Sequence, residues 1–311
     1  MHAPRQVVVI GSVNVDISLR VKAMPAAGET VFGSDAVMCV GGKGANQAAA
    51  AAACGAPTRF IGRIGADVYG GVIRTQLTER GVQVDIAEVP PGTASGLALI
   101  CVEPDGQNRI VVVSGANDLL KPEDLTPLTS LLDSTSIVVL QCETPVPTVE
   151  RAIELAAARG ATVILNLAPF RPVNLARLAR EVSYLILNET EASQLTGMPV
   201  ETIPQATQCA SAIRAKGSPC VIITLGALGC LVADEHGTQH LPSHKVATID
   251  TTGAGDAFVG CLAASLAAGH ERLEAVRRAN LYAALSTTRL GAQVSLPRKA
   301  ELDAAWAEIG R

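Results

Sequence analysis

The segment IVVLQCETPVPTVERAIELAAARGATVILN, residues 137–166, has the pattern of a buried strand, an amphipathic helix and a second buried strand. The apolar run IVVL opens the segment, and TVILN at 162–166 closes it. Between them a helical pattern over 148–159 is followed by Gly160, and a glycine at this position is a common helix stop. The segment therefore predicts two parallel strands joined by a crossover helix.

The same unit recurs on both sides of this segment. Buried-strand runs are found at 6–11, 184–188 and 220–224. Helical patterns over 44–54, 68–80 and 205–216 each end directly before a glycine: Gly55, Gly81 and Gly217. This alternation predicts the α/β class, with a mostly parallel central sheet and helices on both faces.

Two stretches depart from this rhythm. GSVNVDISLRVK, residues 11–22, alternates apolar and polar residues with period two, as a strand with one wet face does. Residues 96–115 contain two β runs around a Pro-Asp-Gly turn, which predicts a hairpin. We expect a small antiparallel β-sheet lid, discontinuous and inserted, formed by 12–40 and 96–115. The α/β domain then comprises 1–11, 41–95 and 116–311.

Composition narrows the functional class. The chain has 311 residues, of which 48% are hydrophobic and 17% charged, so a large buried core is expected. A net charge of −4 and only 3% aromatic residues argue against nucleic-acid and anionic-membrane partners. The eight cysteines form no C-x-x-C pair, no apolar run is long enough for a membrane span, and no signal segment opens the chain. These features predict a cytoplasmic protein with reduced thiols.

Several buried runs end in polar residues, which predicts a ligand cleft. In open α/β sheets, ligands bind beyond the carboxyl ends of the strands. Polar side chains follow four runs, at Gln141 with Glu143, Asn166, Asn188 and Thr224. On the lid strand, Asn14 and Asp16 share one face, and such a pair is suited to holding sugar hydroxyls as well as to facing solvent.

The stretch GGKGANQ, residues 41–47, is neither a Walker loop nor a dinucleotide fingerprint. Lys43 is followed by glycine rather than serine or threonine, and Gln47 stands where the fingerprint needs glycine. The stretch still offers backbone that a ligand can approach, one cation, and the Asn46 amide near a helix start. An ordinary glycine-rich helix entry is the alternative.

The stretch DTTGAGDAF, residues 250–258, places glycines and one carboxylate before an apolar helix. Unobstructed backbone N–H groups at a helix N-terminus form an anion site. Asp256 is then either a helix N-cap or a general base beside a phosphate cradle, and the residues alone leave both readings open.

Together these motifs resemble the ribokinase-like (PfkB) family of sugar kinases. Residues 41–67 are similar to the family's N-terminal signature, and DTTGAGDAFVG, 250–260, to its C-terminal signature. PAAGET at 25–30, NETEASQLTG at 188–197 and TLGALG at 224–229 also match in order and spacing, so the similarity covers essentially the whole chain.

The resemblance implies a role for each matching residue. Asp256 would be the catalytic base, with the backbone of Gly253, Ala254, Gly255 and Asp256 forming the anion hole. The matching sugar-binding positions are Asn14, Asp16, Gly42, Lys43, Asn46, Glu143 and Asp256. The matching ATP-binding positions are Asn188, Thr224, Gly226, Gly229, Gly255 and Asn280. The implied reaction is ATP-dependent phosphorylation of D-ribose at O5, giving ribose 5-phosphate.

The resemblance also implies two cations. Glu191 would help to hold Mg²⁺ through water. An activating monovalent cation, usually K⁺ in this family, would bind near the anion hole. Its matching positions are Asp250, Thr252, Ser286, Arg289, Gly291 and Ser295, several of them through backbone carbonyls.

Other functions fit parts of the sequence. A family kinase for 2-deoxyribose or for a nucleoside is the nearest alternative, although Phe32 is the single aromatic residue in 12–40 and none lies in 96–115. A sugar phosphate would need a cationic cluster, for which Arg20, Lys22 and Arg109 are candidates. A sugar-binding regulator without catalysis would tolerate loss of the base or of the anion hole. Both are intact in this sequence, which argues against such a regulator. A dinucleotide-dependent oxidoreductase would need a glycine fingerprint that this sequence lacks.

A homodimer through the lid is expected from the family. Val13, Val15 and Ile17 offer an apolar face that would suit such a dimer or would pack on its own domain.

Overall fold

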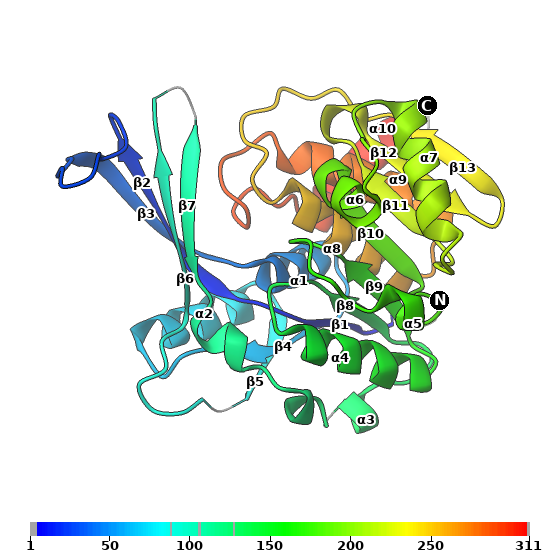
Figure 1. Ribbon diagram of the computed structural model, residues 1–311, viewed down its shortest axis with the longest axis horizontal. Helices are drawn as coiled ribbons and strands as arrows, with labels where there is room; N and C mark the ends of the chain where they lie inside the picture. The colour runs from blue at the N-terminus through cyan, green and yellow to red at the C-terminus, as the bar shows by residue number, and fades with distance from the viewer. Residues whose placement is uncertain (1–4, 88, 105–106, 127, 310–311) are drawn as a thin grey trace.

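The computed structural model describes residues 5–309 except 88, 105–106 and 127, and it shows two sheets. In these residues a nine-stranded sheet forms an α/β body, and a four-stranded sheet rises from one side of it (Figure 1). The body strands lie in the order β13-β12-β11-β10-β9-β8-β1-β4-β5. The smaller sheet has the order β3-β2-β6-β7. The predicted α/β class with a β lid is confirmed.

The bounds of the elements are as follows. The body strands are β1 Val7–Ile10, β4 Thr58–Arg63, β5 Val82–Ala87, β8 Ile137–Leu140, β9 Thr162–Asn166, β10 Tyr184–Asn188, β11 Val221–Thr224, β12 Cys230–Asp234 and β13 Gly237–Leu241. The lid strands are β2 Asn14–Val21, β3 Gly33–Gly41, β6 Gly96–Val102 and β7 Asn108–Val113. The α-helices are α1 Lys43–Ala53, α2 Val68–Glu79, α3 Leu128–Leu131, α4 Val146–Ala158, α5 Leu175–Leu178, α6 Glu189–Thr196, α7 Ile203–Arg214, α8 Ala254–Ala267, α9 Arg272–Ser286 and α10 Lys299–Ile309. Short 3-10 turns are η1 Gly115–Leu119, η2 Pro122–Leu125 and η3 Gly226–Leu228.

The body sheet buries both of its faces. Alternate residues of each parallel strand enter different cores, so that Val7 and Val9 lie in one and Val8 and Ile10 in the other. Helices α1, α2, α8, α9 and α10 cover the first face, and α3 to α7 cover the second. This two-sided burial explains why the strand runs are continuously apolar.

The alanine run of α1 serves close helix packing. α1 lies against α8 at the base of the lid, and Ala48 to Ala51 are buried. A Cβ added to Gly260 of α8 would lie 2.5 Å from the Ala50 Cβ and 2.5 Å from the Gln47 carbonyl oxygen. Small side chains on both helices therefore allow this approach, which brings the polar start of α1 against the start of α8.

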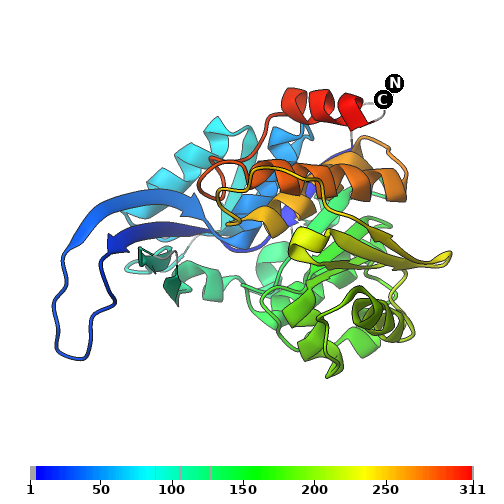
Figure 2. The same cartoon turned by 90° about the horizontal axis from the view of Figure 1, so that it is seen from above.

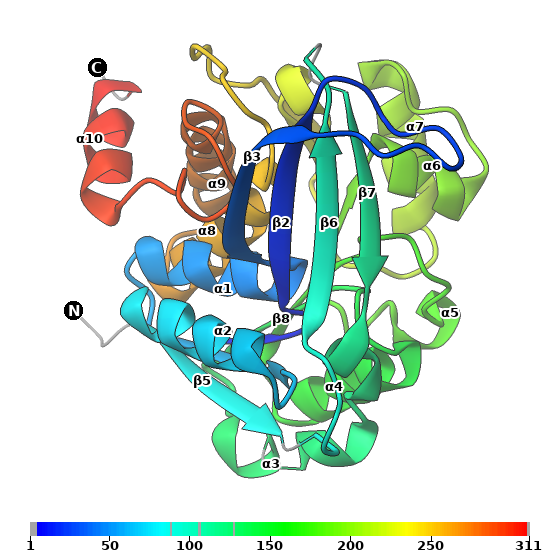
Figure 3. The same cartoon turned by 90° about the vertical axis from the view of Figure 1, so that its left-hand side faces the viewer.

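The lid is a mixed sheet rather than the antiparallel one that the sequence suggested. β2 pairs with β3 and β6 with β7 in antiparallel fashion, but β2 and β6 are parallel, with Asn14 beside Gly96. Both central strands leave the body at the same end, which makes their directions equal (Figure 3). The β2–β3 arm extends well beyond the body (Figure 2). The predicted hairpin is present, although Asp105 and Gly106 of its turn lie outside the described residues.

The apolar face of β2 does not offer the exposed surface considered above. Val13 and Val15 are fully buried in the body core, and Ile17 packs partly against it. Strands β3, β4, β5, β12 and β13 were not predicted. In the described part of the chain, no helix has the length and apolar character needed to cross a bilayer.

Candidate active site

Asp256 lies in the first turn of α8, and two side chains of α1 hold its carboxylate. Asn46 Nδ2 donates to Oδ2 at 2.9 Å, and Gln47 Nε2 donates to Oδ1 at 2.9 Å. The N-cap of α8 is Gly253, with φ of 76°, and no side chain caps the helix. The N-cap alternative for Asp256 is therefore wrong, because its oxygens face side-chain amides rather than the helix backbone.

Several charged groups surround Asp256. Burial is the main cause that raises the pKa of Asp256, and the nearby Glu143 adds to it, while Lys43 and the two amides act in the opposite direction. Burial alone would lower the pKa of Lys43, but Asp256, Glu143 and Glu191 outweigh it and the pKa is raised. Lys43 is thus a firmly charged cation among carboxylates of separate elements.

Asp16 faces this group from the lid. Burial, then Glu143 and Asp256, raise the pKa of Asp16 to about 6. Its Oδ1 is buried and has no hydrogen-bond partner in the described residues. A Cβ on Gly41 would lie 1.9 Å from Asp16 Oδ2, so only glycine leaves room for the carboxylate. An acceptor held in this way is ready for a donor from a ligand.

The glycine-lysine loop is fixed by Glu143, which follows β8. Glu143 Oε2 accepts from Ser12 Oγ at 2.6 Å and from the Lys43 backbone N–H at 3.0 Å. Gly42 has φ of 85°, and a Cβ there would lie 2.8 Å from the Val13 Cα. The second glycine therefore permits both a left-handed turn and close contact with the start of β2.

Asn117 fixes the neighbouring lid residue, and sequence reasoning missed it. It is buried in η1, accepts from the Val13 N–H at 2.9 Å and donates to the Val13 carbonyl at 3.0 Å. Its Nδ2 also donates to Asn14 Oδ1 at 2.9 Å. This bond holds Asn14 at the base of the lid strand through its amide oxygen, and the amide nitrogen of Asn14 takes no part in it.

The positions matched to ATP lie around the ends of β10 and β11. Asn188 and Thr224 are register partners on adjacent strands. Asn188 caps α6 by accepting from the Glu191 N–H at 2.8 Å, and Glu191 Oε2 accepts from the Asn188 N–H at 2.9 Å. Burial raises the pKa of Glu191, and Asp256 adds to this, while Lys43 lowers it. Glu191 thus links this edge to the Asp256 group.

Gly226, Gly229 and Asn280 complete that set. Gly226 begins η3 with φ of 51°, and Gly229 follows it with φ of 94°. A Cβ on Gly229 would lie 2.1 Å from the Leu241 carbonyl oxygen. Asn280, buried on α9, donates from Nδ2 to the Pro242 carbonyl at 2.8 Å. Its side chain therefore ties α9 to the segment after β13, and no bond in the described residues joins it to Asn188.

Asp250 organises the loop matched to the monovalent cation. Its Oδ1 accepts from the Thr252 N–H at 2.9 Å and from Thr252 Oγ1 at 2.7 Å, and its Oδ2 accepts from the Gly291 N–H at 2.8 Å. Burial is the largest single cause and acts to raise the pKa of Asp250, but the three bonds together outweigh it and the pKa is lowered. The side chain of Arg289 is half-exposed and pairs with Glu301 of α10.

Ser286 and Ser295 are buried near the same loop. Ser286 Oγ donates to the Ala283 carbonyl at 2.8 Å, and Ser295 Oγ donates to the Ala292 carbonyl at 3.2 Å. Their hydroxyls are therefore occupied by their own turns. The described residues contain no group of three or more His, Cys, Asp or Glu side chains that would hold a metal ion by itself.

The start of α8 presents backbone donors. Ala257 donates the helical bond to the Gly253 carbonyl at 2.8 Å, and the Ala254 N–H donates to Thr251 at 3.1 Å. The N–H groups of Gly255 and Asp256 precede the first helical bond and have no partner within the helix. A Cβ on Gly255 would meet nothing within 4 Å, so there is open space beside this residue.

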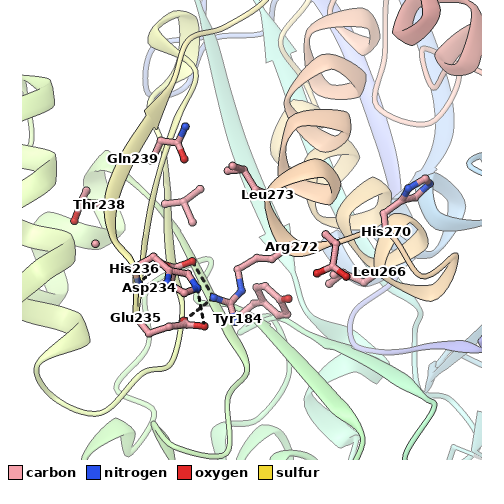
Figure 4. A pocket seen from close by; sticks show the side chains of 13 residues that line it. Tyr184, Asp234, Glu235, His236, Thr238, Gln239, Leu266, His270, Arg272 and Leu273 are labelled. Atoms are coloured by element: carbon pink, nitrogen blue, oxygen red, sulfur yellow. Dashed lines mark hydrogen bonds and ion pairs between the residues drawn. The ribbon is translucent and has the colours of Figure 1, made fainter. Parts of the chain in front are cut away.

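A hollow of about 750 Å³ lies away from this group. Figure 4 shows it, with Arg272 directed at Asp234 and Glu235. The Arg272 guanidinium lies 2.8 Å from Asp234 and 2.6 Å from Glu235. Tyr184 begins β10, so the hollow is at the opposite end of the strand from Asn188. Arg272 is paired with two of its carboxylates, and none of the motif residues lines it.

Comparison with known proteins gives one consistent result. The model of the "pfkB family carbohydrate kinase" matches residues 4–299. The chain is 37% identical over 299 residues to a ribokinase of Bacillus subtilis, covering 96% of this chain and 98% of that protein. It is 36% identical over 292 residues to a deoxyribokinase of Salmonella typhi, covering 94% and 95%.

A solved structure agrees with these relatives. Ribokinase of Arabidopsis thaliana, complexed with ribose and ATP, superposes with a TM-score of 0.88 at 32% identity, covering 97% of this chain and 98% of that one. The family match, the full-length relatives and the carboxylate beside a glycine-rich helix start all lead to the same assignment. The chain belongs to the pfkB family of ATP-using carbohydrate kinases.

Proposed function

We propose that the protein transfers the γ-phosphoryl group of ATP to O5 of D-ribose. The observation that carries the proposal is Asp256: its two oxygens are held by Asn46 and Gln47, and it lies at an open helix start opposite the lid carboxylate Asp16. A base fixed in this way accepts the proton of an alcohol, while the backbone N–H groups beside it stabilise charge on the phosphoryl group.

The sugar would bind between the lid and the body. Asp16, with its unpartnered Oδ1, and Asn14 would face the sugar from the lid, and Lys43 and Glu143 would face it from the body. We propose that 12–40 and 96–115 act as the lid domain and that its closure excludes water, which would otherwise accept the phosphoryl group.

The residues present fit the two implied cations. Glu191 has one oxygen in the α6 cap, which leaves the other for the water shell of Mg²⁺ held mainly by ATP phosphates. Asp250 carries a charge with no basic side chain among the groups that shift its pKa, as expected beside K⁺ ligated by backbone carbonyls. Mg²⁺ supplies charge neutralisation when bound, and Asp250 with Thr252 orders the 291–295 loop next to the anion hole.

The choice between ribose and 2-deoxyribose rests on hydrogen-bond donors. Curated relatives at 35–37% identity include both ribokinases and deoxyribokinases. A buried acceptor that stays unpaired is costly, and Asp16 Oδ1 gains most from the sugar with more hydroxyls. This consideration supports ribose. 2-Deoxyribose is the second candidate.

An ADP-release assay on a panel tests the proposal. D-Ribose, 2-deoxyribose, fructose 6-phosphate and adenosine are each supplied with ATP and Mg²⁺, with and without K⁺. We expect the highest kcat/KM with D-ribose and stimulation by K⁺. A preference for 2-deoxyribose would move the assignment to the second candidate, and a preference for adenosine would overturn the pentose assignment altogether.

The pKa of Asp16 predicts how sugar binding depends on pH. With a pKa of about 6, Asp16 is protonated below that pH and loses acceptor capacity for sugar hydroxyls. We expect the KM for ribose to rise below about pH 6 in the wild type. Asp16→Asn should have a weak, pH-independent affinity. Initial rates at several ribose concentrations between pH 5 and 8 measure this.

The raised pKa of Asp16 also predicts how stability depends on pH. Stability should be higher at low pH, where sugar binding should be weaker. Because the folded state holds the Asp16 proton more tightly than the unfolded state, stability is lost as pH rises from about 4 through about 6. Asp16→Asn carries no charge to desolvate, so its Tm should exceed the wild-type Tm at pH 7 and approach it near pH 4. A Tm that is lower at pH 7 would show that the carboxylate stabilises the lid instead.

A homodimer through the lid is also proposed. β7 is an edge strand of the lid, and Ile110 and Val111 are 53% and 62% exposed on its opposite faces. A second copy would cover such apolar side chains. Sedimentation should give twice the chain mass of 32.0 kDa, and Ile110→Lys or Val111→Lys should weaken the dimer, depending on which face is covered. A wild-type monomer at micromolar concentration would refute this.

A further inference from the structure

Two chains of side-chain amides converge on Asp256. Gln141 Nε2 donates to Gln47 Oε1 at 2.7 Å, and Gln47 donates to Asp256 Oδ1. Gln293 Nε2 donates to Asn46 Oδ1 at 3.0 Å, and Asn46 donates to Asp256 Oδ2. Both pathways start from a glutamine that does not touch Asp256. They start from different parts of the fold, since Gln141 follows β8 and Gln293 lies in the loop before α10.

The direction of every bond follows from the carboxylate. An ionised carboxylate only accepts, so Asn46 and Gln47 must each turn an NH₂ group towards it. Their carbonyl oxygens then point away and require donors. Gln141 and Gln293 supply these donors, which fixes the orientation of both inner amides. Asn166 at the end of β9 accepts the second N–H of Gln47 at 3.1 Å and supports the same orientation.

The outer glutamines are left incompletely bonded. Gln141 Oε1 and Gln293 Oε1 are both buried and have no hydrogen-bond partner in the described residues. A Cβ on Gly11 would lie 1.9 Å from Gln141 Oε1, so glycine at this position leaves room for the side chain where it lies. A network that served packing alone would be expected to satisfy its acceptors, because buried polar groups are nearly always paired. The two unpaired oxygens are consistent with outer glutamines whose amide groups are turned to donate to Gln47 and Asn46.

We propose that Gln141 and Gln293 are positioning residues that act through Gln47 and Asn46 to keep Asp256 ionised and oriented for proton abstraction. This inference rests on the proposed role of Asp256 as the base. Hydrogen bonds donated to the ionised form favour it, and two oriented amides offset part of the cost of burying the charge. Each carboxylate oxygen retains capacity for the hydroxyl proton, since one amide bond does not exhaust its lone pairs.

Several charged groups face Asp256 and set the background for this effect. Lys43 of α1 favours its ionised form, whereas Glu143 after β8 disfavours it. Asp16 of β2 and Glu191 of α6 also interact with it electrostatically. None of these groups changes in a glutamine variant. A shift of the Asp256 titration in such a variant is therefore attributable to the amides.

The test compares Gln141→Met and Gln293→Met with the wild type and with Gln83→Met, an exposed position on β5. Methionine has a similar length and no N–H donor. The kcat is measured from pH 5 to 9 at saturating ribose and ATP, so that the sugar affinity of Asp16 does not enter, and it is repeated in an Asp16→Asn background. Circular dichroism and Tm establish that each variant is folded.

We expect the acid limb of the kcat profile to move up by about one pH unit in both variants, which is about a tenfold loss of kcat on the acid side. Activity at high pH should recover towards the wild type, and Gln83→Met should not shift. A folded variant with a uniform fall in kcat and an unmoved limb would overturn the inference. Gln293→Met tests it independently if Gln141→Met does not fold. If Asp256→Asn keeps its turnover, the proposed base itself is wrong. If Asp256→Asn is inactive but the acid limb is unmoved in both glutamine variants, only the positioning role of Gln141 and Gln293 is refuted.

Discussion

Asp256→Asn should lower kcat by about a thousandfold while the protein still binds ribose. The substitution removes the proposed acceptor of the hydroxyl proton. Among the proposed sugar-binding side chains, Asn46 bonds Asp256 directly, and the others have contacts of their own. Asn14, Asp16, Lys43 and Glu143 are held by other contacts, including Asn117 to Asn14 and Ser12 to Glu143. The KM for ATP should change little, because the backbone of the α8 start is unaltered.

The stability of the variant provides a second readout. The wild type buries the Asp256 charge at a cost, as its raised pKa indicates, so the neutral amide should not lower the Tm by much. One of the two inner amides loses its acceptor, which opposes the gain.

Asp85→Asn, which breaks only a surface pair with Arg59, is the matched control and should retain turnover. Ribose binding by calorimetry separates lost chemistry from lost affinity. Near-normal kcat in Asp256→Asn would remove the base assignment.

The fold was largely predictable because the body strands are buried on both faces. Continuous runs such as those at Val7–Ile10 and Ile137–Leu140 carry a strong local signal, and glycines mark the helix ends. Strand β3 was missed because residues 33–38 are exposed and carry no clear alternation. The pairing of β2 with β6 was also out of reach, because it is set by where two distant segments leave the body.

The site was predictable where its motifs resemble those of a known family. The residues alone left the role of Asp256 open, and it was the resemblance that placed Asp256, Asn46, Lys43 and Asp16 in one group; the structure brings these side chains together. The sequence did not give the partners of Asp256, since Gln47 has no local signal beyond being polar inside an alanine-rich helix. Gln293 lies far from Asn46 in the sequence, and only the packing of the last loop against α1 reveals it.

Alanine at Gly255 and alanine at Gly253 should impair the protein in different ways: the first should lower turnover and the second should lower stability. Comparing the two variants tests the proposed anion hole. Gly255 has room for a Cβ and an ordinary backbone, and alanine there favours the helix, so the Tm of Gly255→Ala should stay level or rise slightly. If the proposed anion hole is correct, the added methyl would crowd the phosphoryl group at the N–H donors of the α8 start. We expect kcat to fall about a hundredfold, the scale of losing one oxyanion-hole donor.

Gly253→Ala should instead damage the fold first. Gly253 has φ of 76°, and its Cβ would lie 2.8 Å from the Ala292 Cβ of the neighbouring loop. A left-handed alanine costs about 1–2 kcal/mol before the clash is counted, so the Tm should fall and the 291–295 loop should be displaced. The proposed stimulation of turnover by K⁺ would depend on that loop, so it should weaken in Gly253→Ala. In Gly255→Ala the ratio of turnover with K⁺ to turnover without K⁺ should stay as in the wild type. Melting curves and ADP release with and without K⁺ measure both. If Gly255→Ala turned over at the wild-type rate, the phosphoryl group would have to bind elsewhere, because a methyl group and a phosphate cannot share the space over one N–H.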